Sequence, residues 1–210
     1  MRADARVAFE PRKTPSQARS TVTVEAICEA VIQVLLSHGG ERLTTTRVAA
    51  RAGVSVGTLY QYYPNKQALL LAVLEDHLNK VTARFEAACA GACHKPLPEM
   101  IREVVEAFVD AKMERADISV ALYKAASGLG GQELVKRISR RSRRAVDAML
   151  QTAPGVRLPP GNYVIDTLLS ALMGVMRTLL EAQPSPAVVR KTREQLVILC
   201  QAYVAAATAQ

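Results

Sequence analysis

Histidine, the side chain that most often transfers protons near neutral pH, occurs only three times in the 210 residues. His38, His77 and His94 lie far apart, on separate elements of the predicted fold. The chain also lacks the GxGxxG and Walker-type glycine loops that cradle phosphate groups. An enzyme needs a nucleophile with an orienting base, a phosphate loop or a metal cluster. The sequence therefore predicts no catalytic residues and a protein that is not an enzyme.

Long apolar runs are missing as well. The closest candidate for a membrane-spanning helix, 163–180, is interrupted by Asp166 and Arg177, whereas a span needs about 20 apolar residues. The N-terminal segment contains no apolar signal-peptide core. The four cysteines show no spacing typical of a disulfide framework. These absences predict a cytoplasmic protein with no membrane partner and with reduced thiols.

What the chain does contain is typical of a globular protein. Hydrophobic residues make up 50% of the sequence and charged residues 22%, a balance that excludes a disordered chain. The formal net charge is +8. Such a charge favours polyanionic partners, although charge alone implies only non-specific attraction.

Apolar residues recur at helical spacing through most of the chain, and no strand-type alternation stands out. Glycine and proline clusters near 39–40, 96–98, 128–131, 154–161 and 184–186 divide the pattern into helices. We expect residues 1–16 to form a flexible basic arm, and Asn65 and Asp117 to cap helices. The predicted fold is all-α with about nine helices, at about 17–38, two within 44–63, 66–90, 98–114, 117–127, 131–152, 162–182 and 186–208.

The segment TTTRVAARAGVSVGTLYQYY, residues 44–63, carries the clearest functional signal. Thr44 or Thr45 can cap a first short helix, and Ser55 can cap a second one. Gly53 lies between them, where a tight turn needs a residue that tolerates positive φ. Val48, Ala49 and Ala52 on the first helix, and Leu59 and Tyr63 on the second, are expected to pack inward. This pattern predicts a helix-turn-helix that reads DNA.

The side chains left on the outer face of the second helix suit a major groove. Gln61 can bond bidentately to adenine, and Thr58 offers a hydroxyl and a methyl group. Tyrosine hydroxyls suit phosphates, and Gly57 permits a close approach of the backbone. Lys66, near the start of the following helix, can meet another phosphate. We expect phosphate contacts to position the protein, whereas Gln61 and Thr58 read the sequence.

On these residues the chain resembles the TetR family of bacterial transcriptional regulators. The family pattern of a threonine-rich helix, an AGVS-type turn, a recognition helix and a KxxLL entry to the next helix corresponds here to TTTRVAARAGVSVGTLYQYYPNKQALLLAVL, within a resemblance that covers about residues 20–80. The resemblance implies a three-helix DNA-binding domain over 17–66, or to about 81 with the start of the fourth helix. A helical ligand-binding and dimerisation domain would occupy 82–210. Residues implied or argued to contact DNA are Thr44, Thr45, Thr46, Arg47, Ser55, Val56, Gly57, Thr58, Tyr60, Gln61, Tyr62 and Lys66.

The resemblance also implies partners for the C-terminal part. Family members form homodimers through their last two helices, here about 162–182 and 186–208, and both segments are rich in apolar residues. A ligand-responsive repressor would bind a palindromic operator in double-stranded DNA and be released by a small-molecule effector. A TetR-type activator is an alternative. The residues that we name as candidate effector-pocket lining are Met100, Phe108, Met113, Tyr123, Met173, Met176 and Arg177, although core packing explains each of them equally well.

Two other patterns have competing interpretations. Cys89, Cys93 and His94 place two thiols one helical turn apart beside an imidazole, which is the basis of a second alternative, a metal- or redox-sensing repressor. Cys89 also belongs to an apolar stripe and no fourth ligand is evident, so structural thiols are the preferred interpretation and no cofactor or metal is predicted. The basic run at 136–144 resembles a second nucleic-acid patch. Its charges lie opposite an apolar stripe, so a solvated helix face is the preferred interpretation.

Overall fold

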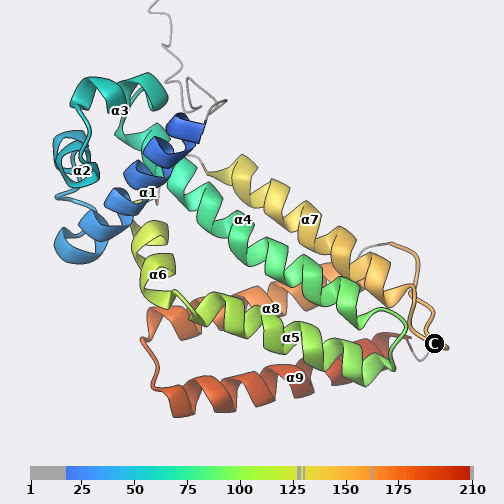
Figure 1. Cartoon of the computed structure of the whole chain (residues 1–210). Helices are drawn as coiled ribbons and strands as arrows, with labels where there is room; N and C mark the ends of the chain where they lie inside the picture. The colour runs from blue at the N-terminus through green and yellow to red at the C-terminus, as the bar shows by residue number, and fades with distance from the viewer. Residues whose placement is uncertain (1–17, 127–128, 130, 162, 209–210) are drawn as a thin grey trace, which may run out of the picture. The chain divides into compact units, whose positions relative to one another are not determined.

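The computed structural model describes residues 18–126, 129, 131–161 and 163–208. Every regular element among these residues is an α-helix (Figure 1). The predicted N-terminal arm lies outside the described residues. The helices are α1 Ala18–His38, α2 Thr45–Ala52, α3 Val56–Tyr62, α4 Lys66–Ala92, α5 Leu97–Met113, α6 Ala116–Ala125, α7 Gln132–Leu150, α8 Tyr163–Glu181 and α9 Pro186–Thr208.

The helix boundaries agree with the predicted ones because glycine, proline and capping residues mark them. Gly39, with φ of 77°, follows α1 and donates its backbone N–H to the Leu35 carbonyl at 2.9 Å. Asn65 precedes α4, and its side-chain oxygen accepts the Ala68 N–H at 2.8 Å. Pro186 is the first residue of α9. Its lack of an N–H costs no hydrogen bond there, because the first N–H groups of a helix have no partner within the helix. The prediction that Asp117 caps α6 is wrong, since α6 begins at Ala116 and Asp117 lies inside its first turn.

Contacts divide the chain into two compact units. The first comprises the described parts of 1–77 and 117–132, and the second comprises 78–116 and the described parts of 133–210. The sequence pattern places 117–132 in the C-terminal domain, whereas α6 packs with the N-terminal residues. His77 and Ser119 share a hydrogen bond of 2.7 Å. A Cβ atom added to Gly40 would lie 3.1 Å from the Ala125 Cβ, so the glycine allows α6 to approach this loop.

The core of the first unit is built around α1. Its residues Ile27, Val31 and Val34 are buried and recur at helical spacing. α2 packs against α1, and α3 packs against α2. These contacts fix the two short helices, which are too short to be stable alone in water.

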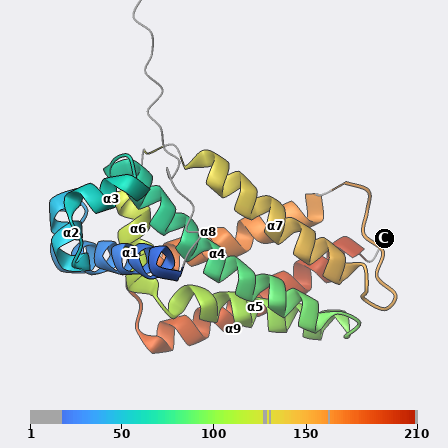
Figure 2. The ribbon, with the colours of Figure 1, turned by 45° about the horizontal axis from the view of Figure 1, so that its top comes forward.

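The second unit has one continuous apolar core. α5, α8 and α9 run alongside one another, as both views of the ribbon show (Figures 1 and 2). The rings of Phe85 and Phe108 meet edge to face at the centre, with centroids 5.4 Å apart. Such a pair adds about 1 kcal/mol beyond the burial of its apolar area.

Two helical segments, Ser20–His38 and Tyr163–Glu181, are long and apolar enough to cross a membrane by length and composition alone. Core helices of proteins that do not enter membranes pass the same test. Both segments contribute to apolar cores here, through Ile27 and Val31 of α1 and through Leu172 and Met176 of α8. The two segments therefore do not indicate a membrane protein.

Candidate nucleic-acid interface

The turn between α2 and α3 has the backbone geometry that the sequence predicts. Thr44 caps α2, its hydroxyl oxygen accepting the Arg47 N–H at 3.2 Å. Gly53 follows the helix in the left-handed region, with φ of 68° and ψ of 28°. The Val54 N–H then donates to the Ala49 carbonyl at 3.0 Å. This arrangement ends α2 sharply and sends the chain directly into α3.

Two inward side chains anchor α3 against the unit. Ser55 caps the helix by accepting the Thr58 N–H at 2.9 Å. Leu59 is fully buried and Tyr63 is 4% exposed. The Tyr63 hydroxyl lies 3.7 Å from the Cys28 Sγ, and burial raises the pKa of Tyr63 above its ordinary value. Tyr63 is therefore a core residue, and it leaves the opposite face of α3 to contact a ligand.

That opposite face presents polar groups and little bulk. Tyr60 is 40% exposed, and its hydroxyl lies 3.2 Å from the Thr45 hydroxyl on α2. Gln61 and Gly57 are exposed beside it. A Cβ added to Gly57 would meet only the Ser55 hydroxyl, at 3.6 Å, so this position is open. The face can thus approach a partner closely and offer it an amide and a phenol.

The structure also shows where the other predicted contact residues lie. Thr44, Thr46, Arg47 and Ser55 are exposed, whereas Thr45, Val56, Thr58, Tyr62 and Lys66 are half-buried. The Thr58 hydroxyl lies 2.9 Å from the Ser55 hydroxyl. That bond engages the Thr58 oxygen within the protein and leaves its methyl group as the simpler contact for a base.

Several positive side chains around this face form hydrogen bonds within the protein. The Arg47 guanidinium donates to the Arg42 carbonyl at 2.9 Å, and the Lys66 ammonium donates to the Gly40 carbonyl at 3.3 Å. Arg51 donates to the Gln33 side chain at 2.6 Å. Arg51 and Arg42 are exposed cations that the motif does not identify, because neither lies on the outer face of α3.

The candidate effector residues differ in burial and in the unit to which they belong. Met100, Phe108 and Met176 are buried in the core of the second unit, and Met113 packs against that core. Met173 and Arg177 are exposed on α8, and Arg177 forms an ion pair with Glu181 at 2.9 Å. Tyr123 belongs to the first unit. The role of these seven residues in effector binding stays a prediction.

A small cavity does exist in the second unit, with different walls. It has a volume of about 10 Å³, which is close to the space that one water molecule needs. All its lining groups are apolar or weakly polar: Phe85, Ile101, Val104, Val105, Val146, Met149, Leu168, Leu169, Leu172 and Cys200. The cavity could not be found from sequence, because Val, Ile and Leu at helical spacing cannot be distinguished from ordinary core residues.

Two family models match the chain, one in its N-terminal part and one in its C-terminal part. The model described as "Bacterial regulatory proteins, tetR family" matches residues 27–73. The model described as "Tetracyclin repressor-like, C-terminal domain" matches residues 96–203, which is about half of the chain. The chain belongs to the TetR family. TetR-family proteins are DNA-binding transcriptional regulators and not enzymes, so the helix-turn-helix is a DNA-binding element.

Curated relatives of this TetR-family protein match it over part of their length. The HTH-type transcriptional repressor KstR of Mycolicibacterium smegmatis is 38% identical over 66 residues, 31% of this chain and 32% of its own. The fatty acid metabolism regulator protein of Bacillus subtilis is 28% identical over 60 residues, which cover 29% of this chain and 31% of that protein. The chain thus spans about a third of the length of these relatives.

Solved structures extend the likeness to the whole fold. A TetR-family regulator from Streptomyces coelicolor has a TM-score of 0.69 at 19% identity, covering 89% of this chain and 82% of that one. LfrR of Mycobacterium smegmatis, solved in complex with proflavine, has a TM-score of 0.56 at 24% identity, covering 85% of this chain and 96% of that one. At these identities the comparison establishes the fold.

The three groups proposed for a metal- or redox-sensing TetR protein are not arranged as ligands. Cys89 is 1% exposed, and burial raises the pKa of its thiol to about 12. The Cys93 thiol lies 3.5 Å from the Cys89 carbonyl, and the His94 backbone N–H donates to Thr152 at 2.8 Å. The described residues contain no group of three or more metal-capable side chains. The burial of Cys89 in the apolar core supports the structural interpretation of this thiol.

Alkylation of the native protein with iodoacetamide tests that interpretation. The thiolate is the reactive form, and at pH 9 a thiol with a pKa of about 12 is ionised in about one molecule in a thousand. Cys89 should therefore stay unlabelled from pH 7 to 9, as should buried Cys200, whose pKa burial raises to about 11. The half-buried thiols, Cys28 and Cys93, should be labelled before these two. Peptide mass spectrometry reads the order, and rapid native labelling of Cys89 together with Cys93 would contradict it.

Proposed function

We propose that this TetR-family regulator is a cytoplasmic, ligand-responsive repressor that binds a palindromic operator as a homodimer. The observation that carries the proposal is the exposed face of α3, where Gly57, Tyr60 and Gln61 stand clear of the core. An α-helix with this face outward fits the major groove of B-DNA. A small molecule bound in the second unit would release the operator.

Distinct roles follow for the residues on this face. Gln61 can accept from and donate to adenine, which makes it the principal reader of base sequence. The Tyr60 hydroxyl, with that of Thr45 beside it at 3.2 Å, can donate to a phosphate oxygen. The Thr58 methyl group can contact a thymine methyl while its hydroxyl remains bonded to Ser55. Discrimination between bases would then depend mainly on Gln61.

Exposed apolar residues support the homodimer through α8 and α9. Met173 on α8 is 46% exposed, and Ile198 and Leu199 on α9 are 57% and 47% exposed. Small residues such as Gly174 and Ala202 are also exposed on these helices, which allows a second pair of helices to approach closely. A two-fold axis would pair this face with itself and set the two recognition helices on half-sites about 34–36 Å apart.

The cavity supports an apolar effector. Its walls offer ten apolar or weakly polar side chains and no ionised group, so an uncharged hydrocarbon-rich molecule suits it. Because its volume is about 10 Å³, such a ligand would bind only to a more open conformation of the second unit. A ligand can shift the protein between two conformations only if it binds them with different affinity. α4, which contributes residues to both units, is the element through which we expect the two states to differ.

Base preference tests the reading role of Gln61. In Gln61→Ala, fluorescence anisotropy with a panel of single-base operator variants should show discrimination falling about tenfold at one position in each half-site. Tyr60→Ala is the matched comparison, and it should weaken binding to every duplex by a similar factor. Unchanged relative affinities across the panel for Gln61→Ala would refute the reading role.

A further inference from the structure

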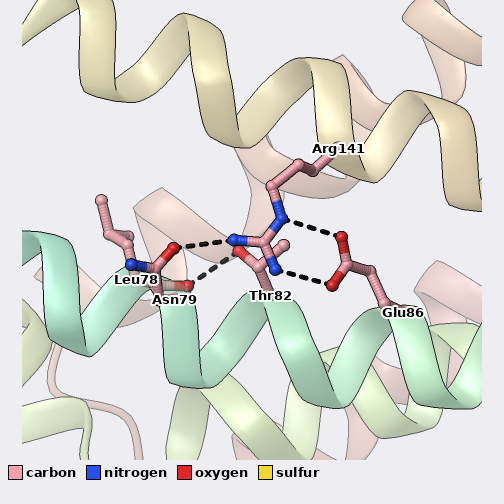
Figure 3. Close-up of polar contacts among 5 residues, drawn as sticks. All are labelled: Leu78, Asn79, Thr82, Glu86 and Arg141. Atoms are coloured by element: carbon pink, nitrogen blue, oxygen red, sulfur yellow. Dashed lines mark hydrogen bonds and ion pairs between the residues drawn. The ribbon is translucent and has the colours of Figure 1, made fainter.

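The cations of α7 divide into two groups with different surroundings. Arg141 and Arg143 point toward neighbouring helices, where acidic partners meet them. The Arg141 guanidinium binds both carboxylate oxygens of Glu86, at 2.9 and 2.7 Å, and donates to the Asn79 side chain at 2.7 Å (Figure 3). Arg143 donates to Asp166 at 2.6 Å. These bonds hold α7 to α4 and α8, and they fix which face of α7 remains outward.

The outward face carries the second group. Lys136, Arg137, Arg140 and Arg144 are all exposed. The three arginines follow one another at i, i+3 and i+7, so they form a stripe about 10 Å long on one side of the helix. We refer to Arg137, Arg140 and Arg144 as the arginine stripe. Exposed Ser139 lies next to it in sequence and can add a hydroxyl donor.

An acidic residue adjoins this face at the start of the helix. Glu133 stands at the start of α7, and its carboxylate accepts the Lys136 ammonium at 2.8 Å. The bond with Lys136 lowers the pKa of Glu133, and the charges of Lys136 and Arg140 lower it further. α7 carries two acidic residues, Glu133 and Asp147, against Lys136 and the three arginines of the stripe, so cations outnumber carboxylates among these residues.

The composition of α7 limits which partner the stripe can fit. Its apolar residues Leu134, Val146 and Met149 are buried in the second unit, so they cannot insert into a lipid bilayer as an interfacial helix requires. A stable protein interface needs an apolar or aromatic centre. Among the described residues of α7, the only exposed large apolar side chain is Val135. A regular polyanion needs neither feature.

We propose that the arginine stripe binds the phosphates of double-stranded DNA without regard to base sequence, as a contact additional to the helix-turn-helix. Guanidinium groups match phosphate oxygens bidentately. B-DNA carries one negative charge per about 1.7 Å of its axis when both strands are counted, so a length of about 10 Å holds about six phosphate charges. The inference adds a second DNA surface to the proposed repressor, and its role is affinity for any duplex, not recognition of an operator.

The salt dependence of binding to a duplex of random sequence tests the stripe. In Arg137→Gln/Arg140→Gln/Arg144→Gln, the slope of log affinity against log salt should become shallower by about 2.7. When salt rises from about 50 to about 200 mM, the factor by which affinity falls should then be about 40 times smaller for the variant than for the parent chain. A circular dichroism melt of both proteins checks that the fold is retained. An unchanged slope in a folded variant overturns the proposal.

A matched control separates the stripe from net charge. Arg102→Gln/Arg115→Gln/Arg157→Gln removes three exposed arginines elsewhere in the second unit, and it should change the slope by less than about 1. An equal fall in both variants would mean a general charge effect and would overturn the proposal. A membrane role would also overturn the proposal. It would be shown if the parent chain binds vesicles containing phosphatidylglycerol, and the stripe variant loses that binding while its duplex binding is unchanged.

Different measurements test the arginine stripe and the proposed repressor function. Operator discrimination, measured as the affinity ratio between an operator and a random duplex, should be retained or increased in the stripe variant. If the parent chain shows no such discrimination, the proposed function is wrong. A difference in slope between the stripe and control variants would still support DNA binding by the arginine stripe.

Discussion

Gly57→Glu should abolish operator binding without unfolding the protein. The position is exposed on α3, and an added Cβ meets only the Ser55 hydroxyl at 3.6 Å. The new carboxylate would stand on the face that enters the groove, where repulsion by phosphates costs several kcal/mol, so affinity should fall by at least about 100-fold. Anisotropy with a labelled operator duplex measures the loss.

Stability should move in the opposite direction. Replacing a helical glycine gains about 0.5–1 kcal/mol of helix propensity, and a carboxylate in the first turn of a helix is favourable. The melting temperature of Gly57→Glu should therefore equal or exceed that of the parent chain. Binding lost together with the fold would show that Gly57 has a structural role instead.

Gly91→Glu is the control for added charge. Gly91 is exposed on α4, with no atom within 4 Å of a built Cβ, and it belongs to the second unit. The same substitution there changes net charge and helix propensity equally, and DNA affinity should change by less than about threefold. Equal losses in the two variants would show that the effect of Gly57→Glu comes from net charge.

Ile198→Glu should convert the proposed dimer into a monomer. Ile198 is 57% exposed on α9, so a charge there costs the isolated chain little. At a two-fold interface both subunits would bury the new carboxylate without a partner, a penalty of several kcal/mol that should weaken dimerisation by at least about 100-fold. Sedimentation velocity at micromolar concentrations should then show a single species of monomer mass.

Val135→Glu provides a control of equal exposure. Val135 is also 57% exposed, but it lies on α7, and its variant should sediment as the parent chain does. Monomeric Val135→Glu alongside dimeric Ile198→Glu would move the interface to α7. A parent chain that is itself monomeric would remove the dimer from the account.

The positions of the helices could be predicted from sequence because local chemistry determines them. Ser55 and Thr44 cap their helices through hydroxyl oxygens, and Gly53 adopts the left-handed conformation that the turn requires. Leu59 and Tyr63, four residues apart, both face inward. Each of these features depends on residues within a few positions of one another, so the sequence alone contains the relevant information.

The features that sequence could not predict involve contacts or orientations that the local pattern does not determine. Nothing in the apolar pattern of 116–125 shows that α6 packs with the first unit, because that depends on the fit of Ala125 against Gly40. Tyr123 and Met173 are candidate pocket residues by their type, yet type does not reveal which face of a helix turns toward the core. The sequence offers both the hydroxyl and the methyl group of Thr58 as contacts, and it does not show that the hydroxyl lies within hydrogen-bond distance of Ser55.

Sequencing of genomic DNA fragments captured by the purified protein tests the central claim most directly, because the operator itself need not be identified beforehand. Capture by the parent chain should enrich fragments that share an inverted repeat, with half-site centres about 34–36 Å apart or a multiple of that distance. Capture by Gly57→Glu should enrich no common sequence over the input DNA. A parent chain that enriches no common sequence, or a Gly57→Glu chain that enriches the same repeat, would contradict DNA reading by α3.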